Sequence, residues 1–258
     1  MSEASEVPGI KVSVIGAAGR MGSEVCRAVT GAQGTELVGR YDVGDDLGDL
    51  GGADVVVEFS VPDASAANVA HCISRGVHVV VGTTGWTQDK LAALRAQLSV
   101  KRGVGVLVAP NFAIGAILMM SFAQQAAKFY ESVEVVELHH PDKVDAPSGT
   151  AARTAMLIAR ARQKAGLTDV PDATTSDPDG ARGARVEGIP VHALRLRGLV
   201  AHQEVLFGAP GELLTIRHDS FDRVSFMPGV LEGVRQVRAH PGLTLGLENY
   251  LKLAGPQT

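Results

Sequence analysis

The 258-residue sequence has few cysteines, few aromatic residues and little net charge. Its two cysteines, Cys26 and Cys72, have no partner at metal-binding spacing, which indicates buried, inert thiols in a cytoplasmic protein. Aromatic residues make up 4% of the chain, whereas its 30 glycines fit a fold with many tight strand–helix turns. The formal net charge of −4 gives no general reason to expect nucleic acid or an anionic membrane as a partner.

The sequence also lacks long hydrophobic runs. Its most apolar region, residues 104–120, is interrupted by Pro110 and Asn111, so no membrane span is expected. The N-terminus, M-S-E-A-S-E, is acidic and lacks the cationic and apolar regions of a signal peptide. No basic run, RNA-binding motif or zinc-finger spacing occurs, and no His, Cys and carboxylate cluster has metal-binding spacing. We therefore expect no metal site, no nucleic-acid partner and no membrane partner.

The first 110 residues alternate short β-branched runs with helical patterns. Strands are expected at residues 11–15, 36–41, 54–59, 77–81 and 105–108, with helices ending near residues 30, 75 and 98. This alternation predicts an α/β fold with a Rossmann-type, doubly wound parallel sheet, in which ligands lie beyond the carboxyl ends of the strands. Four polar or glycine-rich turns fall on that edge, and they begin at Gly16, Asp42, Gly82 and Ala109.

The first of these turns reads G-A-A-G-R-M-G, residues 16–22, and lies between a strand and a helix. Its glycine spacing is one position off the commonest dinucleotide fingerprint, but it permits the same tight turn and close approach to a pyrophosphate. Asp42 lies twenty residues beyond Gly22, where such a fold places the carboxylate that binds the adenosine ribose. We favour this role over a merely solvated acidic loop of Asp42, Asp45 and Asp46.

The remainder of the chain predicts a smaller α+β domain with an open mixed sheet of about four strands. Its strands are expected at residues 132–140, 190–196, 202–207 and 212–219, and its helices at residues 114–130 and 150–165. The segment 167–188 is rich in Asp, Pro, Thr and Gly and is expected to be a long surface loop. A helix at residues 227–239 is expected to close the chain and pack on the first domain.

The stretch E-L-H-H-P-D-K-V-D-A-P-S-G-T, residues 137–150, contains the chemistry. It holds His139, His140 and Lys143, and then a turn in which Ser148 or Thr150 can cap a helix. Proton donors, a fixed cation and a helix N-terminus suit an anionic substrate that is protonated as it reacts. For this stretch alone, a polar loop with solvated charges is an equally good interpretation.

The residues His218, Asp219 and Ser220 offer the types of a Ser–His–Asp triad. Neighbouring residues on a strand point to opposite faces, so these three cannot form a relay. Semialdehyde dehydrogenases need a catalytic cysteine after a strand, and neither cysteine is so placed.

Four motifs together resemble the dihydrodipicolinate reductase family of the diaminopimelate and lysine pathway: the glycine loop, G-T-T-G at Gly82, A-P-N-F at Ala109 and the His-His-x-x-Lys stretch. The resemblance covers essentially the whole chain, and A-R-T-A and G-L-V-A-H-Q-E-V-L-F-G look like an actinobacterial type. It implies a dinucleotide-binding domain at residues 1–110, a substrate-binding and tetramerisation domain at 111–223, and a segment at 224–258 that returns to the first domain. It also implies a homotetramer built by pairing the open sheets.

The resemblance implies NADH- or NADPH-dependent reduction of 4-hydroxy-tetrahydrodipicolinate to tetrahydrodipicolinate with loss of water, on a dicarboxylate substrate. The proton donors that it implies are His139 and Lys143. The residues expected to bind the substrate are His140, Lys143, Ser148, Gly149 and Thr150. The residues expected to bind the cofactor are Gly16, Ala17, Ala18, Gly19, Arg20, Met21, Asp42, Gly82, Thr83, Thr84, Ala109, Pro110, Asn111 and Phe112.

The choice of cofactor depends on opposing charges. Asp42 would repel the 2′-phosphate of NADPH, whereas Arg20 and Arg40 can pair with it. Val43 follows Asp42 at a position where some relatives have an arginine. We therefore expect the protein to use both NADH and NADPH, with NADH at least as effective as NADPH. Two alternatives remain: another two-domain NAD(P)-dependent amino-acid dehydrogenase, and a non-catalytic nucleotide-sensing protein, which has no need of the His-His-x-x-Lys stretch.

Overall fold

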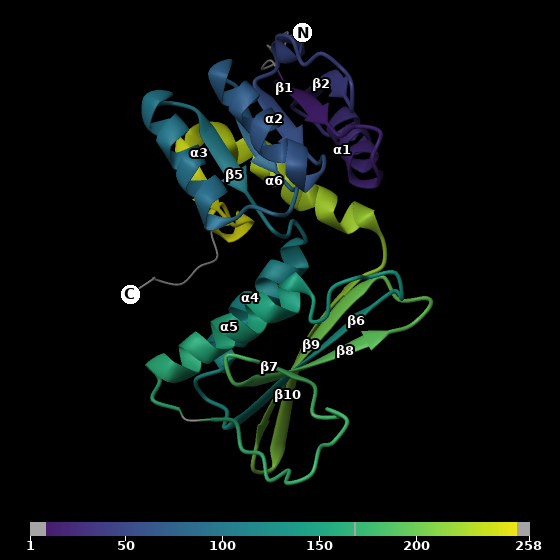
Figure 1. Ribbon diagram of the computed structural model, residues 1–258, viewed down its shortest axis with the longest axis vertical. Coiled ribbons are helices and arrows are strands. Elements are labelled where there is room, and N and C mark those ends of the chain that lie inside the picture. The colour runs from purple at the N-terminus through teal and green to yellow at the C-terminus, as the bar shows by residue number, and fades with distance from the viewer. Residues whose placement is uncertain (1–8, 168, 252–258) are drawn as a thin grey trace, which may run out of the picture. The chain divides into compact units, whose positions relative to one another are not determined.

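The computed structural model describes residues 9–167 and 169–251, which form two compact units (Figure 1). Residues up to Phe112 and from Phe226 onward form unit 1, and Ala113–Ser225 form unit 2. Within the described ranges, no helix is long and apolar enough to cross a membrane. The roles of the two units in nucleotide and substrate binding stay predictions.

Unit 1 is built on a parallel six-stranded sheet with the order β11-β5-β4-β3-β1-β2. Its strands are β1 (Ile10–Ile15), β2 (Thr35–Tyr41), β3 (Val55–Glu58), β4 (His78–Val81), β5 (Gly105–Val108) and β11 (Gly242–Leu245). The central strands are valine-rich and buried, as expected for a sheet that is covered on both faces. The Rossmann-type fold class is thereby confirmed.

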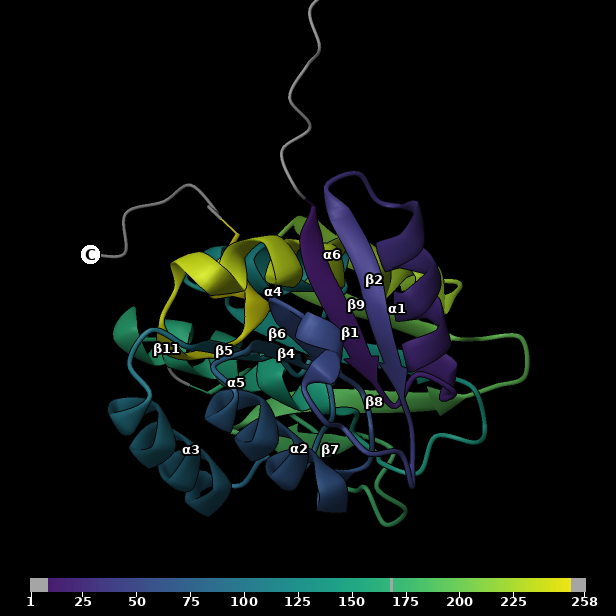
Figure 2. The same ribbon diagram turned by 90° about the horizontal axis from the view of Figure 1, so that it is seen from above.

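Helices cover both faces of this sheet (Figure 2). One face carries α1 (Arg20–Gly31) and α6 (Met227–Gln236), and the other carries α2 (Pro62–Ser74) and α3 (Gln88–Val100). The chain reverses its direction of winding between β1 and β3, which makes their carboxyl ends a topological switch point. The turns at Gly16, Asp42, Gly82 and Ala109 follow β1, β2, β4 and β5, and so share one edge of the sheet.

The C-terminal part of unit 1 differs from the expectation. Helix α6 ends at Gln236, and a 3-10 turn, Val237–Ala239, precedes β11. This sixth strand, G-L-T-L, pairs with β5. It has only four residues and follows Pro241, so its sequence pattern was too short to distinguish it from a loop.

Unit 2 contains a mixed five-stranded sheet with the order β10-β9-β6-β8-β7. Its strands are β6 (Ser132–His139), β7 (Ala184–Val186), β8 (Ile189–Arg195), β9 (Ala201–Ala209) and β10 (Glu212–Ser220). Helices α4 (Ile114–Ala126) and α5 (Gly149–Lys164) lie on one face (Figure 1). Alternate residues of β6, among them Val133 and Val135, pack against them and form the core.

Two expectations for unit 2 were wrong. The segment 167–188 is not loop throughout, because its last part forms β7, which pairs with β8 and gives the sheet a fifth strand. Helix α4 ends at Ala126 rather than near residue 130. The segment is tied to the sheet by Arg182, which binds Glu134 on β6 and Asp172 in the segment itself.

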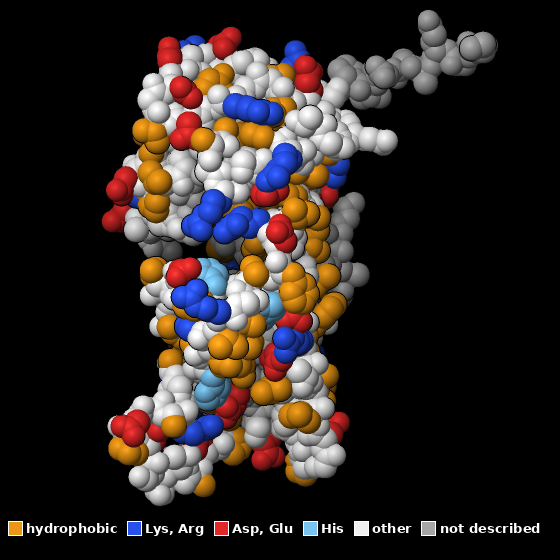
Figure 3. Space-filling model, turned by 90° about the vertical axis from the view of Figure 1, so that its right-hand side faces the viewer, with side chains coloured by type: hydrophobic (Ala, Val, Ile, Leu, Met, Phe, Trp, Pro, Cys, Tyr) orange, Lys and Arg blue, Asp and Glu red, His pale blue; other side chains and the backbone are white. Residues whose placement is uncertain are grey.

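Among the described residues of unit 2, no helix covers the other face of this second sheet. Hydrophobic side chains on this side lie among acidic and basic ones (Figure 3). Leu213 on β10 is 69% exposed and Leu194 on β8 is 42% exposed, while Arg217 and Glu204 form an ion pair. The face is therefore mixed in character rather than uniformly apolar.

Candidate functional site

The glycine loop after β1 requires glycine at two positions. Gly16 has a φ of +82°, and a Cβ on it would lie 2.4 Å from the carbonyl oxygen of Phe59. A Cβ on Gly22, in the first turn of α1, would lie 2.0 Å from the carbonyl oxygen of Gly16. Helix α1 begins at Arg20 without a side-chain cap, so its N-terminus presents backbone N–H groups at the loop. The geometry suits close approach of a phosphate.

Asp42 lies beside this loop at the end of β2. One carboxylate oxygen accepts a hydrogen bond of 2.7 Å from the N–H of Ala18, and the other accepts one of 2.9 Å from the N–H of Val43. These backbone hydrogen bonds, that from Val43 first, hold the pKa of Asp42 below its ordinary value. The side chain is therefore an anion at neutral pH.

The turns after β4 and β5 are packed against Phe59. A Cβ on Gly82 would lie 2.1 Å from the Phe59 ring, and the rings of Phe59 and Phe112 are 5.7 Å apart. Thr83 is buried, and its hydroxyl has no hydrogen-bond partner within the described parts of the chain. The two glycine cradles and this buried hydroxyl fit a dinucleotide, whose amide or ribose groups could satisfy the hydroxyl.

A buried carboxylate at this edge was not anticipated from the sequence. Glu58, the last residue of β3, is fully buried and accepts hydrogen bonds from the Ser60 N–H at 3.1 Å and the Ser65 hydroxyl at 2.6 Å. Asn68 of α2 reaches the same carboxylate at 3.4 Å. The network fixes the turn at residues 59–61, against which Gly16 and Gly82 pack. The only feature of the sequence that could have indicated this buried carboxylate is an acidic residue directly after three valines.

The second candidate site lies in unit 2, around the fully buried carboxylate of Glu137 on β6. Arg195 of β8 binds it bidentately, with both nitrogen–oxygen distances 2.8 Å. The Ser148 N–H donates to Oε1 at 3.0 Å, and Nδ1 of His139 lies 2.5 Å from Oε2. Burial would raise the pKa of Glu137, but the hydrogen bonds from Arg195, His139 and Ser148 outweigh it and lower the pKa. Glu137 is therefore an anion.

His139 lies two residues after Glu137 and on the same face of β6. Because Glu137 accepts from Nδ1, the imidazole is assigned with a proton on Nδ1, which leaves Nε2 to exchange a proton with a ligand. Burial lowers the pKa of His139, the hydrogen bond and charge of Glu137 raise it, and the charges of Lys143 and Arg195 lower it. The net effect is a lowered pKa.

Lys143 and His140 lie in the loop between β6 and α5. The Lys143 ammonium pairs with Asp145 at 2.6 Å. His140 is more exposed than His139, and its Nδ1 is 4.0 Å from the carboxylate of Asp142. The structure thus places one histidine against a buried anion and the other near solvent.

Ser148 caps α5, and its hydroxyl accepts a hydrogen bond of 3.2 Å from the N–H of Ala151. Gly149 and Thr150 form the first turn of the helix, as the sequence predicts. A helix N-terminus favours anions, and the N–H of Gly149 donates a hydrogen bond to the carboxylate of Asp145, so this turn can bind a carboxylate.

Arg195 was missed by sequence reasoning. It is in register with His139 on the neighbouring parallel strand, and it also donates to the carbonyl oxygen of Asp145 at 2.7 Å. Its neighbours in the sequence do not identify Arg195 as a site residue, because its role depends on the pairing of β6 and β8.

The rejection of a triad at residues 218–220 agrees with the structure. Asp219 binds His202, not His218, with 2.7 Å between Nδ1 and Oδ1. The hydroxyl of Ser220 pairs with that of Ser225. The cysteines, both in the described part of the chain, are buried and unpaired, and no metal-binding cluster occurs among the described residues.

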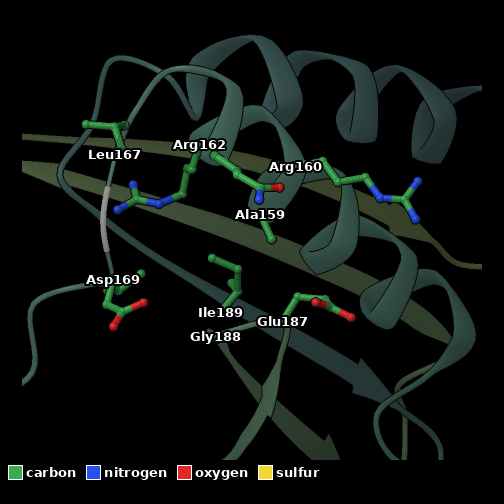
Figure 4. A pocket seen from close by; sticks show the side chains of 10 residues that line it. Ala159, Arg160, Arg162, Leu167, Asp169, Glu187, Gly188 and Ile189 are labelled. Carbon is green, nitrogen blue, oxygen red and sulfur yellow. The ribbon is translucent and has the colours of Figure 1, made fainter.

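A pocket of about 410 Å³ lies at the C-terminal end of α5 (Figure 4). Arg162 lines it, but its guanidinium donates to the backbone carbonyls of Tyr130 and Glu131, and the side chain of Arg160 points away from the other labelled residues. This end of the 16-residue helix is about 24 Å from Ser148 at 1.5 Å per residue. The pocket is therefore separate from the candidate site.

Comparisons with known proteins point to one family. The family models described as "Dihydrodipicolinate reductase, N-terminus" and "Dihydrodipicolinate reductase, C-terminus" match residues 10–112 and 115–251. The 4-hydroxy-tetrahydrodipicolinate reductase of Cutibacterium acnes is 63% identical over 95% of this chain and 99% of its own length. That of Streptomyces coelicolor is 60% identical over 95% of this chain and 98% of its own.

Solved structures show the same relationship. The dipicolinate-bound dihydrodipicolinate reductase from Paenisporosarcina sp. TG-14 has a TM-score of 0.81 at 38% identity, with 94% of this chain and 100% of that chain covered. An amine dehydrogenase from Mycobacterium smegmatis has a TM-score of 0.62 at 15% identity, covering 97% of this chain and 98% of that chain. The second likeness is one of fold alone.

Proposed function

Because the chain belongs to the dihydrodipicolinate reductase family, we propose that it reduces 4-hydroxy-tetrahydrodipicolinate to tetrahydrodipicolinate with loss of water. The reaction belongs to diaminopimelate and L-lysine biosynthesis. The observation that carries the proposal is the arrangement of His139, Lys143 and the N-terminus of α5 around the buried Glu137–Arg195 pair. It combines a proton donor with groups that bind anions.

The glycine loop of unit 1 binds the pyrophosphate of NADH or NADPH in this proposal, and the bound nicotinamide supplies the hydride. The residues from Gly16 to Met21 face the phosphates, and Asp42 receives the adenosine ribose. The residues Gly82, Thr83 and Thr84, together with Ala109, Pro110, Asn111 and Phe112, line the nicotinamide side. Support comes from the absence of room for a Cβ at Gly16 and Gly82 and from the unpartnered hydroxyl of Thr83 within the described chain.

The substrate is a dicarboxylate, and the turn before α5 offers three kinds of anion-binding group. Ser148, Gly149 and Thr150 form the helix N-terminus, Lys143 brings an ammonium group, and His140 lies near solvent in the same loop. A helix N-terminus and a cation together bind a carboxylate without a metal ion.

Hydride addition to a conjugated cyclic imine increases the negative charge on the ring, which a proton must neutralise. His139 gives this proton from Nε2 when its ring is protonated as the imidazolium, and it returns to the neutral form whose Nδ1–H donates to Glu137. Lys143 is the second donor: it protonates the hydroxyl group, which leaves as water while the neighbouring ring carbon loses a proton to solvent, and this gives the conjugated imine that accepts the hydride. Both donors are partly shielded from solvent, with side-chain exposures of 14% for His139 and 22% for Lys143.

A homotetramer in the cytoplasm is part of the proposal. The uncovered face of the second sheet, with Leu194 and Leu213 exposed, offers a surface that a second copy can cover. Light scattering at micromolar concentration is expected to show a tetramer, and a monomer would contradict this part.

The deciding experiment follows the absorbance of the reduced nicotinamide. Substrate is generated in situ from pyruvate and aspartate semialdehyde by the synthase that condenses them. Oxidation of the cofactor is expected only when both precursors and this protein are present. No oxidation with both precursors would contradict the proposal, and reduction of NAD(P)⁺ with amino acids instead would support the dehydrogenase alternative.

A further inference from the structure

We propose that Glu137 and Arg195 act as a positioning pair that orients the imidazole of His139 and, through the same contacts, fixes the substrate-binding turn before α5. This inference rests on the proposed function, since it concerns how the proton donor and the anion site of that function are held together. Neither residue is expected to touch the substrate.

The carboxylate of Glu137 makes four contacts. Oε1 accepts from Nη2 of Arg195 at 2.8 Å and from the Ser148 N–H at 3.0 Å. Oε2 accepts from Nη1 of Arg195 at 2.8 Å and from Nδ1 of His139 at 2.5 Å. A buried anion is tolerated only when it is paired and hydrogen-bonded, and this arrangement satisfies both conditions.

The contacts of Glu137 reach two parts of the candidate site. Through His139 they determine which ring nitrogen is free, and through Ser148 they hold the residue that caps α5. A rotation of Glu137 would therefore displace the proton donor and the anion-binding turn together.

Arg195 connects a third part of the candidate site, the loop that carries Lys143, to the same pair. Its Nη2 also donates to the carbonyl oxygen of Asp145 at 2.7 Å, and the side chain of Asp145 pairs with Lys143. The loop that carries the second proton donor is thus attached to the same guanidinium. A lysine could not replace this arginine, because one ammonium cannot make the bidentate contact and also reach the carbonyl with the same geometry.

The pair also sets the electrostatic surroundings of His139. The charged groups that act on this imidazole are Glu137 on its own strand, Arg195 on β8 and Lys143 in the loop. The anion favours the protonated ring and the two cations disfavour it. Removing the charge of Glu137 and removing that of Arg195 should therefore change the titration of His139 in opposite directions.

The chain offers a matched control on the opposite face of β6. Glu134 likewise binds an arginine, Arg182, and a histidine, His192, with 2.6 Å between its Oε2 and the histidine Nε2. The substitution Glu134→Gln disrupts a similar network on the same strand, but none of its three members lies among the residues proposed for catalysis.

The first test is a histidine NMR titration of the full-length protein, with the His139 resonance identified by its loss in His139→Asn. The pKa of His139 is expected to fall in Glu137→Gln, to rise in Arg195→Met and to stay unchanged in Glu134→Gln. In the double variant Glu137→Gln/Arg195→Met, which buries no unpaired charge, the pKa of His139 should lie between its values in the two single variants. This double variant replaces Arg195→Met in the comparison if the Arg195→Met protein does not fold. Shifts in the same direction, or none, would overturn the inference.

The second test is turnover as a function of pH. For Glu137→Gln we expect kcat to fall by about tenfold or more, and its alkaline limb to move to lower pH, because the donor loses its proton earlier. The KM for the nicotinamide cofactor should stay unchanged, and Glu134→Gln should keep the parental pH profile. Equal profiles for Glu137→Gln and Glu134→Gln would overturn the inference.

The proposed function and the positioning role of Glu137 and Arg195 can fail separately. If His139→Ala retains parental turnover, the proton-donor role in the proposed function is wrong, while the NMR titration still reports whether Glu137 and Arg195 act on His139. If turnover requires His139 but Glu137→Gln behaves like its control, the positioning inference alone is wrong.

Discussion

The carboxylate of Asp42 accepts a 2.7 Å hydrogen bond from the backbone N–H of Ala18, which joins the end of β2 to the middle of the glycine loop. Its other oxygen is held by the N–H of Val43 at 2.9 Å. The acid proposed to bind the ribose therefore also shapes the loop proposed to bind the pyrophosphate. Its lowered pKa keeps it charged across the neutral range.

This relationship predicts the effect of Asp42→Ala on cofactor choice. The parent should use both cofactors, with NADH at least as good, because the fixed anion repels a 2′-phosphate while Arg20 and Arg40 are available to attract it. The substitution removes the repulsion, so the ratio of kcat/KM for NADPH to that for NADH should rise by about tenfold, the factor for about 1.4 kcal/mol. Glu36→Ala, which removes an exposed charge elsewhere on β2, should leave the ratio unchanged. Strict dependence of the parent on NADPH would contradict the argument.

The substitutions His139→Ala and Lys143→Ala test the proton donors. Each is expected to lower kcat by about a hundred- to ten-thousand-fold, the usual contribution of a general acid, while the dissociation constant of the nucleotide stays unchanged. His140→Ala should act mainly on the KM of the substrate, because His140 lies nearer to solvent. Steady-state kinetics and nucleotide titration separate these outcomes. Turnover within a few-fold of the parent for both first variants would show that the roles are misassigned.

The architecture of unit 1 was predictable because its signals are local. Short strand-forming segments that end directly before Gly16, Asp42 or Gly82 indicate the strand, its turn and the edge of the sheet within a few residues of one another. The same motifs identified the family, and the family models confirm it. Strands β7 and β11, of three and four residues, were missed because such short segments form only when a neighbouring strand is already present.

The candidate site was predictable only in part. His139, Lys143 and Ser148 lie within ten consecutive residues, and a helix start and a strand end identify them. Arg195 lies far along the chain, and only the parallel register of β6 and β8 brings it to Glu137. Glu137 itself was taken as the start of a motif, not as its centre, because burial cannot be derived from one acidic residue on an alternating strand.

Alanine substitutions at Gly22 and Gly31, both in α1, test how tightly the start of this helix packs against the glycine loop. Alanine normally stabilises a helix by up to about 1 kcal/mol relative to glycine, and Gly31→Ala should do so, since nothing lies within 4 Å of its added Cβ. Gly22→Ala should instead destabilise the protein by about 1–3 kcal/mol, because its Cβ would meet the Gly16 carbonyl. Urea unfolding measures both. A stabilised Gly22→Ala variant would show that the loop relaxes away from the helix.

Asp145 is expected to compete with the substrate for Lys143. The two groups are 2.6 Å apart, but Asp145 is 50% exposed, so the pair contributes no more than about 1 kcal/mol. Asp145→Asn should therefore lower the KM of the substrate by a factor of about five at most and leave the backbone contact with Arg195 intact. Asp142→Asn, which removes an equal charge from the same loop, is the control. A raised KM in Asp145→Asn would mean that Asp145 supports the binding geometry rather than competing with it.

Three partly buried histidines and the paired carboxylates predict how stability depends on pH. Burial lowers the pKa of His139, His78 and His218 in the folded protein, so the unfolded chain binds protons first as the pH falls below about 6.5. The carboxylates of Glu137 and Glu134 also have lowered pKa values, because hydrogen bonds from arginine and histidine outweigh the effect of burial. Their stabilisation is present above the unfolded-state pKa of about 4.3 and is lost as the pH falls from there through the lower pKa of the folded protein.

The free energy of unfolding should therefore decrease in two stages on acidification, the first from the histidines and the second from the carboxylates. Urea unfolding at intervals from neutral to acidic pH measures both stages. In His78→Asn the first stage should be smaller and the second unchanged, because the substitution removes one of the partly buried histidines and no carboxylate. In Glu134→Gln the second stage should be smaller and the first unchanged. A free energy of unfolding that stays constant through the histidine range would contradict the assignment of these partly buried rings as neutral in the folded protein without substrate.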